Sequence, residues 1–259
     1  MLRRRLPLAL AALALVPAGA PAAGLGADDV RERLAAAGTP ARLDLSGQDL
    51  SGADLSGLDL SGARLARASL FGAKLVRTRL AGADLSGANL NGAWLMGTDF
   101  RGARLVGASL LSVVVLGGEV KARPEFAGAD LSGARVIADF PGVDLSRARL
   151  HGANLGVDIR NQGMGQMRTD LTGARLAGAD LSGADLNRAL LAFADLRGAD
   201  LRGASLFRAK LGGADLGGAD VSGADFAEAD LDGTNLRGAK GVAAAKGLDR
   251  AANRDRALF

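Results

Sequence analysis

The chain of 259 residues has no cysteine, no tyrosine, one tryptophan and one histidine. Without cysteine, disulfide bonds, thiol nucleophiles and cysteine-ligated metals are excluded. The lone histidine, His151, stands beside Gly152, where we expect a solvated surface side chain and not a base or a ligand. We therefore expect no catalytic, cofactor-binding or metal-binding residues, and predict that the chain is not an enzyme.

The chain also lacks a large excess of positive or negative charge, since its formal net charge is +4. Residues 1–22 have the pattern of a secretory signal peptide: Arg3, Arg4 and Arg5, then an apolar run, then a small-x-small cleavage site. The apolar run is short for a membrane span, although an uncleaved anchor is the alternative. Cleavage would reduce the 32 basic residues by three, to 29 against 28 acidic residues. We expect an exported, periplasmic or extracellular protein of nearly neutral charge.

A repeat of five residues dominates what is present. A leucine or another apolar residue returns at every fifth position through residues 45–110 and 171–240. Neither a helix, with a period of 3.6, nor a strand, with a period of 2, matches this spacing, which is typical of a stacked architecture. In the unit Ala53-Asp54-Leu55-Ser56-Gly57, extended backbone would turn Ala53 and Leu55 inward and Asp54 outward. Ser56 and Gly57 would then form a corner, and four such units would close one coil.

These units resemble the pentapeptide repeat family, whose consensus is Ala-(Asp or Asn)-Leu-x-x. The resemblance covers residues 43–240, with interruptions near 111–129 and 156–169. It implies an all-β fold, a right-handed quadrilateral β-helix with about 20 residues in each coil. It also implies that the leucine and the small residue two positions before it point inward.

The two ends of the repeat are predicted to be capped. Residues 23–42 would form an N-terminal cap with a short helix over residues 28–37, started by Asp28 or Asp29 and ended by Gly38. Residues 241–259 would form a C-terminal cap or tail, in which Leu248 and Phe259 pack on the final coil.

The interruptions are interpreted from the spacing of the leucines. Leu131 follows Leu110 by one coil plus one residue. A deletion of one residue precedes Phe140. Leu171 follows Leu155 by three units plus one residue, which indicates an outward loop.

A stride of one coil, or four pentapeptides, also predicts which outward side chains stack. It brings together an apolar strip on the outer surface, formed by Val76, Trp94, Met96, Val114 and Leu116. An exposed apolar strip is usually either covered or used. The neighbouring interruption could fold over it, or the strip could bind a protein partner or a second copy of the chain.

Outward aspartates stack in the same way, as in Asp180, Asp200 and Asp220. Such a row could attract cations or a basic partner, but it also follows simply from the repeat. Basic residues alternate with acidic ones and aromatic residues are few, so nucleic-acid binding is not expected. We expect no small-molecule substrate either, because the interior would be filled with leucine and alanine.

Two classes of function remain open. The first is an exported structural or protein-interaction module that presents the flat outer faces of the solenoid to an unknown protein partner, as a monomer or a homodimer. The second follows from the family resemblance alone: a topoisomerase-binding DNA mimic of the quinolone-resistance type. Such mimicry needs a strongly negative surface inside the cell, and both the near-neutral charge and the leader argue against it.

Overall fold

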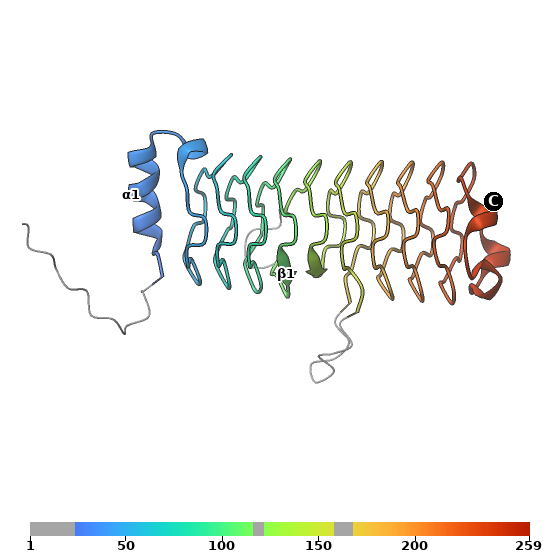
Figure 1. Ribbon diagram of the computed structural model, residues 1–259. Coiled ribbons are helices and arrows are strands. Elements are labelled where there is room, and N and C mark those ends of the chain that lie inside the picture. The colour runs from blue at the N-terminus through green and yellow to red at the C-terminus, as the bar shows by residue number, and fades with distance from the viewer. Residues whose placement is uncertain (1–23, 116–121, 158–167) are drawn as a thin grey trace, which may run out of the picture.

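The computed structural model describes residues 24–115, 122–157 and 168–259. The predicted signal peptide therefore lies outside the described residues. Stacked coils form one elongated tube, with the helix α1 (Ala27–Ala37) at one end and the C-terminus at the other (Figure 1). The coils are held together by parallel backbone pairs between residues that are mostly one coil of four pentapeptides apart, for example Asp44 with Arg64. Four consecutive pentapeptides thus make one coil, as the sequence predicted.

These pairs run along the tube in four series, which we call ladders 1 to 4. Ladder 1 contains Asp44, Arg64, Asp84, Arg104, Asp130, Arg149, Asp180, Asp200, Asp220 and Lys240. Ladder 2 contains Asp49, Ser69, Asn89, Ser109, Arg135, Asn154, Asp185, Ser205, Asp225 and Lys246. Ladder 3 has two runs, first Asp54, Lys74, Trp94 and Val114, then Asp139, Asp170, Leu190, Lys210, Asp230 and Ala252. Ladder 4 contains Asp59, Arg79, Asp99, Glu125, Asp144, Arg175, Asp195, Asp215, Asn235 and Leu258.

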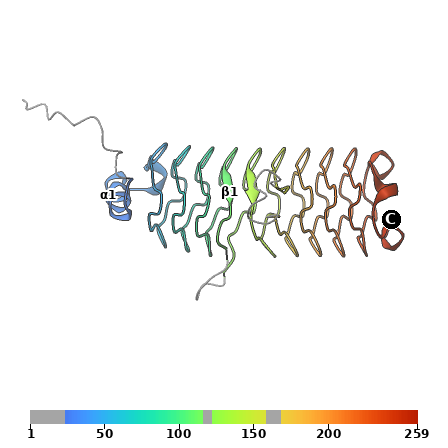
Figure 2. The ribbon, with the colours of Figure 1, turned by 90° about the horizontal axis from the view of Figure 1, so that it is seen from below.

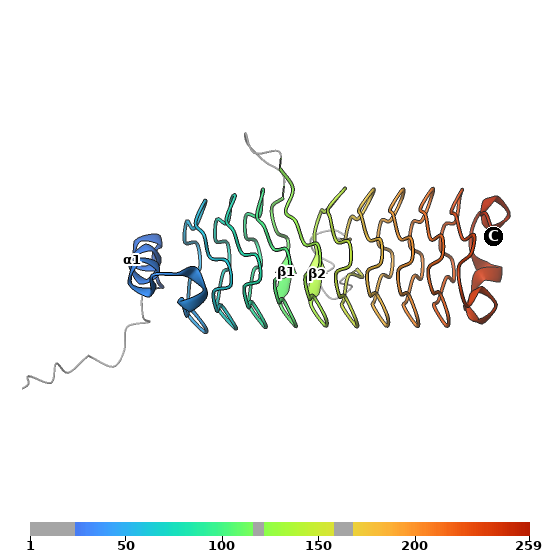
Figure 3. The ribbon, with the colours of Figure 1, turned by 90° about the horizontal axis from the view of Figure 1, so that it is seen from above.

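Most pairs are single bridges, because each side of a coil is extended only briefly between two corners. On ladder 2 the pairing is longer and forms two regular strands, β1 (Ser109–Leu111) and β2 (Arg135–Ile137), which are parallel neighbours (Figure 3). The hydrogen bonds alternate along a side: the Leu45 amide donates to the Arg64 carbonyl at 2.7 Å, and the Arg64 amide donates to the Leu43 carbonyl at 3.0 Å. Backbone polar groups are satisfied between coils, and the interior needs only apolar side chains.

The interior is filled by the repeating apolar residues. The leucine of each unit and the small residue two positions before it are buried, as in Leu55 and Ala53. Phe100 and Phe126, which replace leucine in adjacent coils, stack with their ring centroids 4.8 Å apart. Thr98 replaces alanine, and its hydroxyl donates to the Leu75 carbonyl at 2.7 Å. Among the described residues, no buried side-chain nitrogen or oxygen lacks a hydrogen-bond partner. The core therefore follows the prediction.

The N-terminal end is covered by α1, which lies across the first coil (Figures 1 and 2). Val30 is fully buried, and Leu34 packs against the core. The predicted start was wrong, because the N-cap is Gly26 and not an aspartate. The Asp29 carboxylate instead accepts a hydrogen bond from the Gly26 amide at 2.8 Å. Gly38 ends the helix in the left-handed region, with φ of 73°, as predicted. A short 3-10 helix, η1 (Pro40–Arg42), leads into the first coil.

The interruptions differ in length from the interpretation of the sequence. The spacing of the leucines placed Leu131 one coil after Leu110. In the structure Leu110 pairs with Val136 instead, so the first insertion adds six residues to a coil and not one. The coil after it is one residue short, since Asp130 pairs with Arg149, which confirms the predicted deletion. At the second interruption Asp139 pairs with Asp170, a spacing that exceeds one coil by eleven residues. Both insertions leave the four-ladder arrangement intact on either side.

The C-terminal segment is a final coil with longer corners. The pattern Ala-Lys-Gly at Ala239–Gly241 returns six residues later at Ala245–Gly247, and each unit contains a 3-10 turn: η3 (Val242–Ala244), η4 (Leu248–Arg250) and η5 (Arg254–Arg256). Backbone pairing continues to Leu258. Leu248 is 9% exposed and packs on the core as predicted, but Phe259 is 52% exposed, so its predicted packing was wrong. The Arg254 guanidinium lies over the Phe259 ring instead.

Candidate functional site

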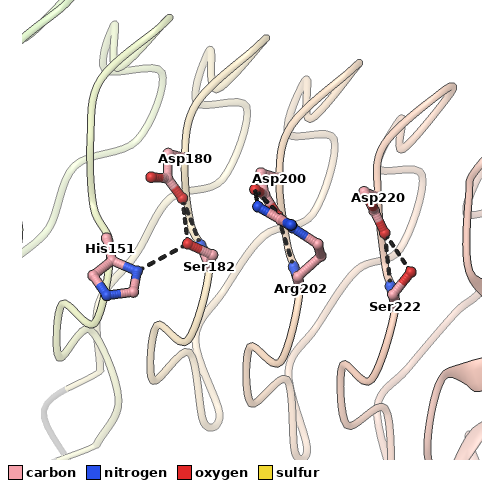
Figure 4. A network of polar contacts seen from close by, with 7 residues as sticks. All are labelled: His151, Asp180, Ser182, Asp200, Arg202, Asp220 and Ser222. Atoms are coloured by element: carbon pink, nitrogen blue, oxygen red, sulfur yellow. Dashed lines mark hydrogen bonds and ion pairs between the residues drawn. The ribbon is translucent and has the colours of Figure 1, made fainter.

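The outward aspartates of the ladders stabilise the corners. The Asp180 carboxylate accepts hydrogen bonds from the Ser182 amide at 3.0 Å and from the Ser182 hydroxyl at 2.5 Å (Figure 4). The same arrangement recurs two coils further on, at Asp220 and Ser222. An aspartate or asparagine whose side chain bonds the backbone two residues later is a common turn device. The aspartates of the repeat therefore serve the fold, in line with one of the two interpretations of the sequence.

His151 lies on the exposed surface, where its Nδ1 is 2.9 Å from the Ser182 hydroxyl (Figure 4). The serine stands between the imidazole and the Asp180 carboxylate. In a nucleophilic triad the histidine stands between the serine and the carboxylate, so this order differs from that of a triad. The contact fits the predicted surface role of this histidine.

Arginines placed within and beside the ladders neutralise much of the acidic charge. Arg202 donates to both carboxylate oxygens of Asp200, with Nη2 2.6 Å from Oδ2, and these bonds hold the pKa of Asp200 below its usual value (Figure 4). On ladder 4, the Arg79 guanidinium donates to Asp59 at 2.8 Å and is the largest cause that lowers the pKa of Asp59 to about 2. In residues 24–115, 122–157 and 168–259, no group of three or more histidine and acidic side chains could hold a metal ion. Asp59 and Asp200 are thus paired with arginines, whereas Asp180 and Asp220 are bonded to the serines of their own corners.

The predicted apolar strip is only partly exposed. Trp94 is 43% exposed, and Val76 and Val114 are half-buried. Met96, however, is 4% exposed, which corrects its predicted place on the outer surface. Part of the first interruption itself runs beside Met96, since the next amide, that of Gly97, donates to the Ala122 carbonyl at 2.7 Å. Leu116 lies outside the described residues. Of the predicted strip, three side chains therefore remain at the surface: Trp94, its neighbour on ladder 3, Val114, and Val76.

Sequence reasoning missed two other exposed aromatic side chains. Phe71 is 56% exposed at the corner between ladders 2 and 3, and Phe193 is 72% exposed at the corner between ladders 3 and 4. Phe193 has φ of 59°, a value that favours glycine. Its ring occupies the space where a Cβ on Gly213 would lie, 2.6 Å away. The available signal was a phenylalanine at a corner position, where most other units have a small or polar residue.

The four ladders also differ in charge. Every residue of ladder 1 is charged, whereas ladder 2 holds three consecutive uncharged residues, Ser69, Asn89 and Ser109. These three lie beside Phe71 and Asn91 of the adjoining corner. We call these five residues the neutral face. Reading the sequence at intervals of one coil would have revealed it.

In the part of the chain that the structure describes, no helix has the length and hydrophobicity needed to cross a membrane.

The buried leucine rows, the four ladders and the corner aspartates define a β-solenoid of five-residue units. A family model for pentapeptide repeats matches the chain in eight copies, over residues 41–65, 63–102, 125–156, 169–206 and 204–240. The chain belongs to the pentapeptide repeat family, as its sequence indicated.

Solved structures are similar to this chain to different degrees. HetL from the cyanobacterium Nostoc sp. strain PCC 7120, a pentapeptide repeat protein involved in regulation of heterocyst differentiation, is 35% identical with a TM-score of 0.70, over 83% of this chain and 86% of HetL. QnrB1, a plasmid-mediated fluoroquinolone resistance protein, is 23% identical with a TM-score of 0.33, over 76% of this chain and 91% of QnrB1. A pentapeptide repeat protein from the Arabidopsis thaliana thylakoid lumen is 34% identical with a TM-score of 0.21, over 39% of this chain and 67% of that chain. No match was found among curated proteins.

Proposed function

We propose that this chain is an exported, non-enzymatic structural or interaction protein that binds a protein partner through the outer faces of its coils. The filled interior supports this, because leucine, alanine and phenylalanine leave only outward side chains to meet another molecule. We also infer that the coils form a right-handed quadrilateral β-helix. Four ladders with four pentapeptides in each coil support the four-sided section, and family membership supports the handedness.

The observation that carries the proposal is the exposed indole of Trp94 on ladder 3, next to the half-buried Val114. Tryptophan is among the residues that contribute most to protein interfaces, because its large apolar surface loses contact with water on binding. Val76, at the corner that follows ladder 3, would extend the contact. The strip gives a partner an apolar anchor on a surface that is otherwise mostly polar.

Two measurements test the proposal: the first tests export, and the second tests the apolar strip. Cell fractionation with N-terminal sequencing should find the chain outside the cytoplasm and beginning near residue 23. A full-length cytoplasmic protein would contradict the proposed export.

Crosslinking in cells, followed by quantification of a reproducible partner, tests the strip. Trp94→Asp should reduce recovery of that partner about tenfold or more, as expected for a residue that anchors an interface. Leu190→Asp is the matched control, since it changes a half-buried apolar residue on the same ladder several coils away. Equal recovery with both variants would remove the strip from the interface.

The topoisomerase-binding alternative has less support. Arginines share the ladders with the aspartates, and ladder 1 alternates Asp44, Arg64, Asp84 and Arg104. A DNA mimic needs an uninterrupted negative surface. We expect the chain to leave gyrase supercoiling unprotected against a fluoroquinolone, and protection would revive the alternative.

A further inference from the structure

We propose that the neutral face (Ser69, Phe71, Asn89, Asn91 and Ser109) binds a neutral glycan chain. This site goes beyond the proposed protein interaction and does not depend on it.

The fold does not require the loss of charge at the neutral face. The Asn89 carboxamide oxygen accepts a hydrogen bond from the Asn91 amide at 3.1 Å, which is the turn that aspartate makes elsewhere on the ladders. The uncharged run is bounded by Asp49 on one side and Arg135 on the other, so charged residues fit the same ladder in neighbouring coils. Asparagine keeps the turn and removes the charge. The fold therefore does not require the residues of the neutral face to be uncharged.

The two asparagines present hydrogen-bond donors. The Asn91 side-chain oxygen accepts bonds from the Ser109 hydroxyl at 2.7 Å and from the Leu111 amide at 2.9 Å. Both side-chain oxygens are therefore engaged within the protein, which fixes their orientation. Within the described residues, the structure records no acceptor for the side-chain nitrogen of Asn89 or Asn91. Each nitrogen carries two N–H groups, so the surface offers fixed, uncharged donors.

An aromatic ring stands beside these donors. Phe71 and Asn91 occupy the same corner in successive coils, since the Gly72 amide donates to the Asn91 carbonyl at 2.9 Å. Phe71 is 56% exposed, so its ring is accessible to a ligand. The π face of the ring is negative and attracts polarised C–H groups, which line the apolar face of a pyranose.

The chemistry of the face selects the class of ligand. Phosphates, sulfates and carboxylates are bound by arginine or lysine, and calcium-bridged sugars need carboxylates, but all five members of the neutral face are uncharged. Serine is depleted in the core of protein interfaces, whereas hydroxyl and amide groups match the hydroxyls of a sugar. The neutral face spans three successive coils, Ser69 to Ser109 on ladder 2, which are about 4.8 Å apart, so a linear polymer can contact more than one coil. A neutral polysaccharide fits these features better than a protein does.

The experiment is affinity electrophoresis of the full chain in native gels that contain hydroxyethylcellulose, galactomannan or dextran, with polygalacturonate as the acidic probe. We expect at least one neutral polymer to retard the protein and polygalacturonate to have no effect. Phe71→Ala and Asn89→Asp should each weaken the retardation about tenfold, because they remove the stacking face or introduce a charge that must be desolvated.

Matched controls separate the site from general effects. Phe207→Ala removes the aromatic side chain at the same corner in a later coil, and Asn154→Asp adds a charge on the same ladder, where the Asn154 side-chain oxygen also accepts a turn amide, that of Gly156. Both controls should keep the retardation, and thermal unfolding should show all four variants folded.

Absence of retardation in every neutral gel would overturn the proposal. So would folded Phe71→Ala and Asn89→Asp proteins that migrate like the parent chain. If these variants instead lose the crosslinked protein partner and no polymer retards the chain, the neutral face belongs to a protein interface. Trp94→Asp should affect the partner alone, so the two proposals fail independently.

Discussion

Gly247, in the final coil, is the position where one methyl group should be most informative. It has φ of +68°, and a Cβ there would lie 2.6 Å from the Ala227 amide nitrogen and 2.7 Å from the Ala227 Cα. Gly233 has nearly the same backbone conformation, with φ of +65°, but a Cβ there would meet nothing within 4 Å. Both changes to alanine force an L-residue into the left-handed region, at about 1–2 kcal/mol each. The difference between the two variants therefore isolates the contact with Ala227.

The size of that difference is bounded by two responses. If the final coil stays docked, the added methyl overpacks rigid backbone, which costs about 1–3 kcal/mol. If the coil detaches, the burial of Leu248 is lost, worth about 1.5–3 kcal/mol. The hydrogen bond from the Phe226 amide to the Lys246 carbonyl, 2.8 Å long, would break as well. The chain takes the cheaper response, so we expect Gly247→Ala to cost about 2–5 kcal/mol in total.

Urea unfolding measures both free energies, and amide hydrogen exchange locates the damage. Gly247→Ala should accelerate exchange in residues 240–259 more than in the central coils, whereas Gly233→Ala should not. Equal destabilisation by the two variants, with unchanged exchange at the C-terminus, would show that the final coil does not pack as described.

Three further changes have defined outcomes. The pKa of Asp59 is lowered to about 2, chiefly by Arg79, so the stability it contributes is present above pH 4 and is lost as the pH falls towards 2. Asp59→Asn should flatten the decline of urea stability in that range, and an unchanged slope would contradict the pairing. Thr98→Val removes the hydroxyl bond to the Leu75 carbonyl and should cost about 1 kcal/mol in urea unfolding; a neutral effect would mean that the bond adds nothing. Leu248→Ala should cost about 2–5 kcal/mol in the same assay if the final coil covers the core, and a loss below about 1 kcal/mol would argue for a loosely attached end.

The repeating parts of the fold could be predicted, because the same positions of every five-residue unit must be buried. Leu55 and Ala53 are buried for the same reason as their counterparts one coil later: extended backbone turns alternate side chains inward. The start of α1 could not be predicted in this way. Two aspartates were available as caps, and the choice of Gly26 depends on the path of the chain against the first coil.

The final coil was missed because its period is six and not five. The signal was present in the repeated Ala-Lys-Gly, at Ala239–Gly241 and Ala245–Gly247. Each glycine is left-handed and opens a 3-10 turn, which adds one residue to the corner. Of the candidate site, Trp94 was predicted because its outward position follows from the stride, whereas the burial of Met96 depends on the path of an insertion.

Insertion lengths show most clearly what a five-residue pattern leaves undetermined. The interval from Leu110 to Leu131 equals four units plus one residue, or three units plus six. The leucine pattern is identical in both cases, because it fixes only the remainder after division by five. The two cases rotate the following chain by one side of the coil, and so decide which outward residues share a ladder. The backbone pairing of Leu110 with Val136 selects six extra residues and places Arg135 directly after Ser109 on ladder 2. Either insertion length, one extra residue or six, would thus bury the same leucines. The surface that meets a partner depends on it, and for that reason the charged boundary of the neutral face at Arg135 is found only when the coils on both sides of the insertion are aligned.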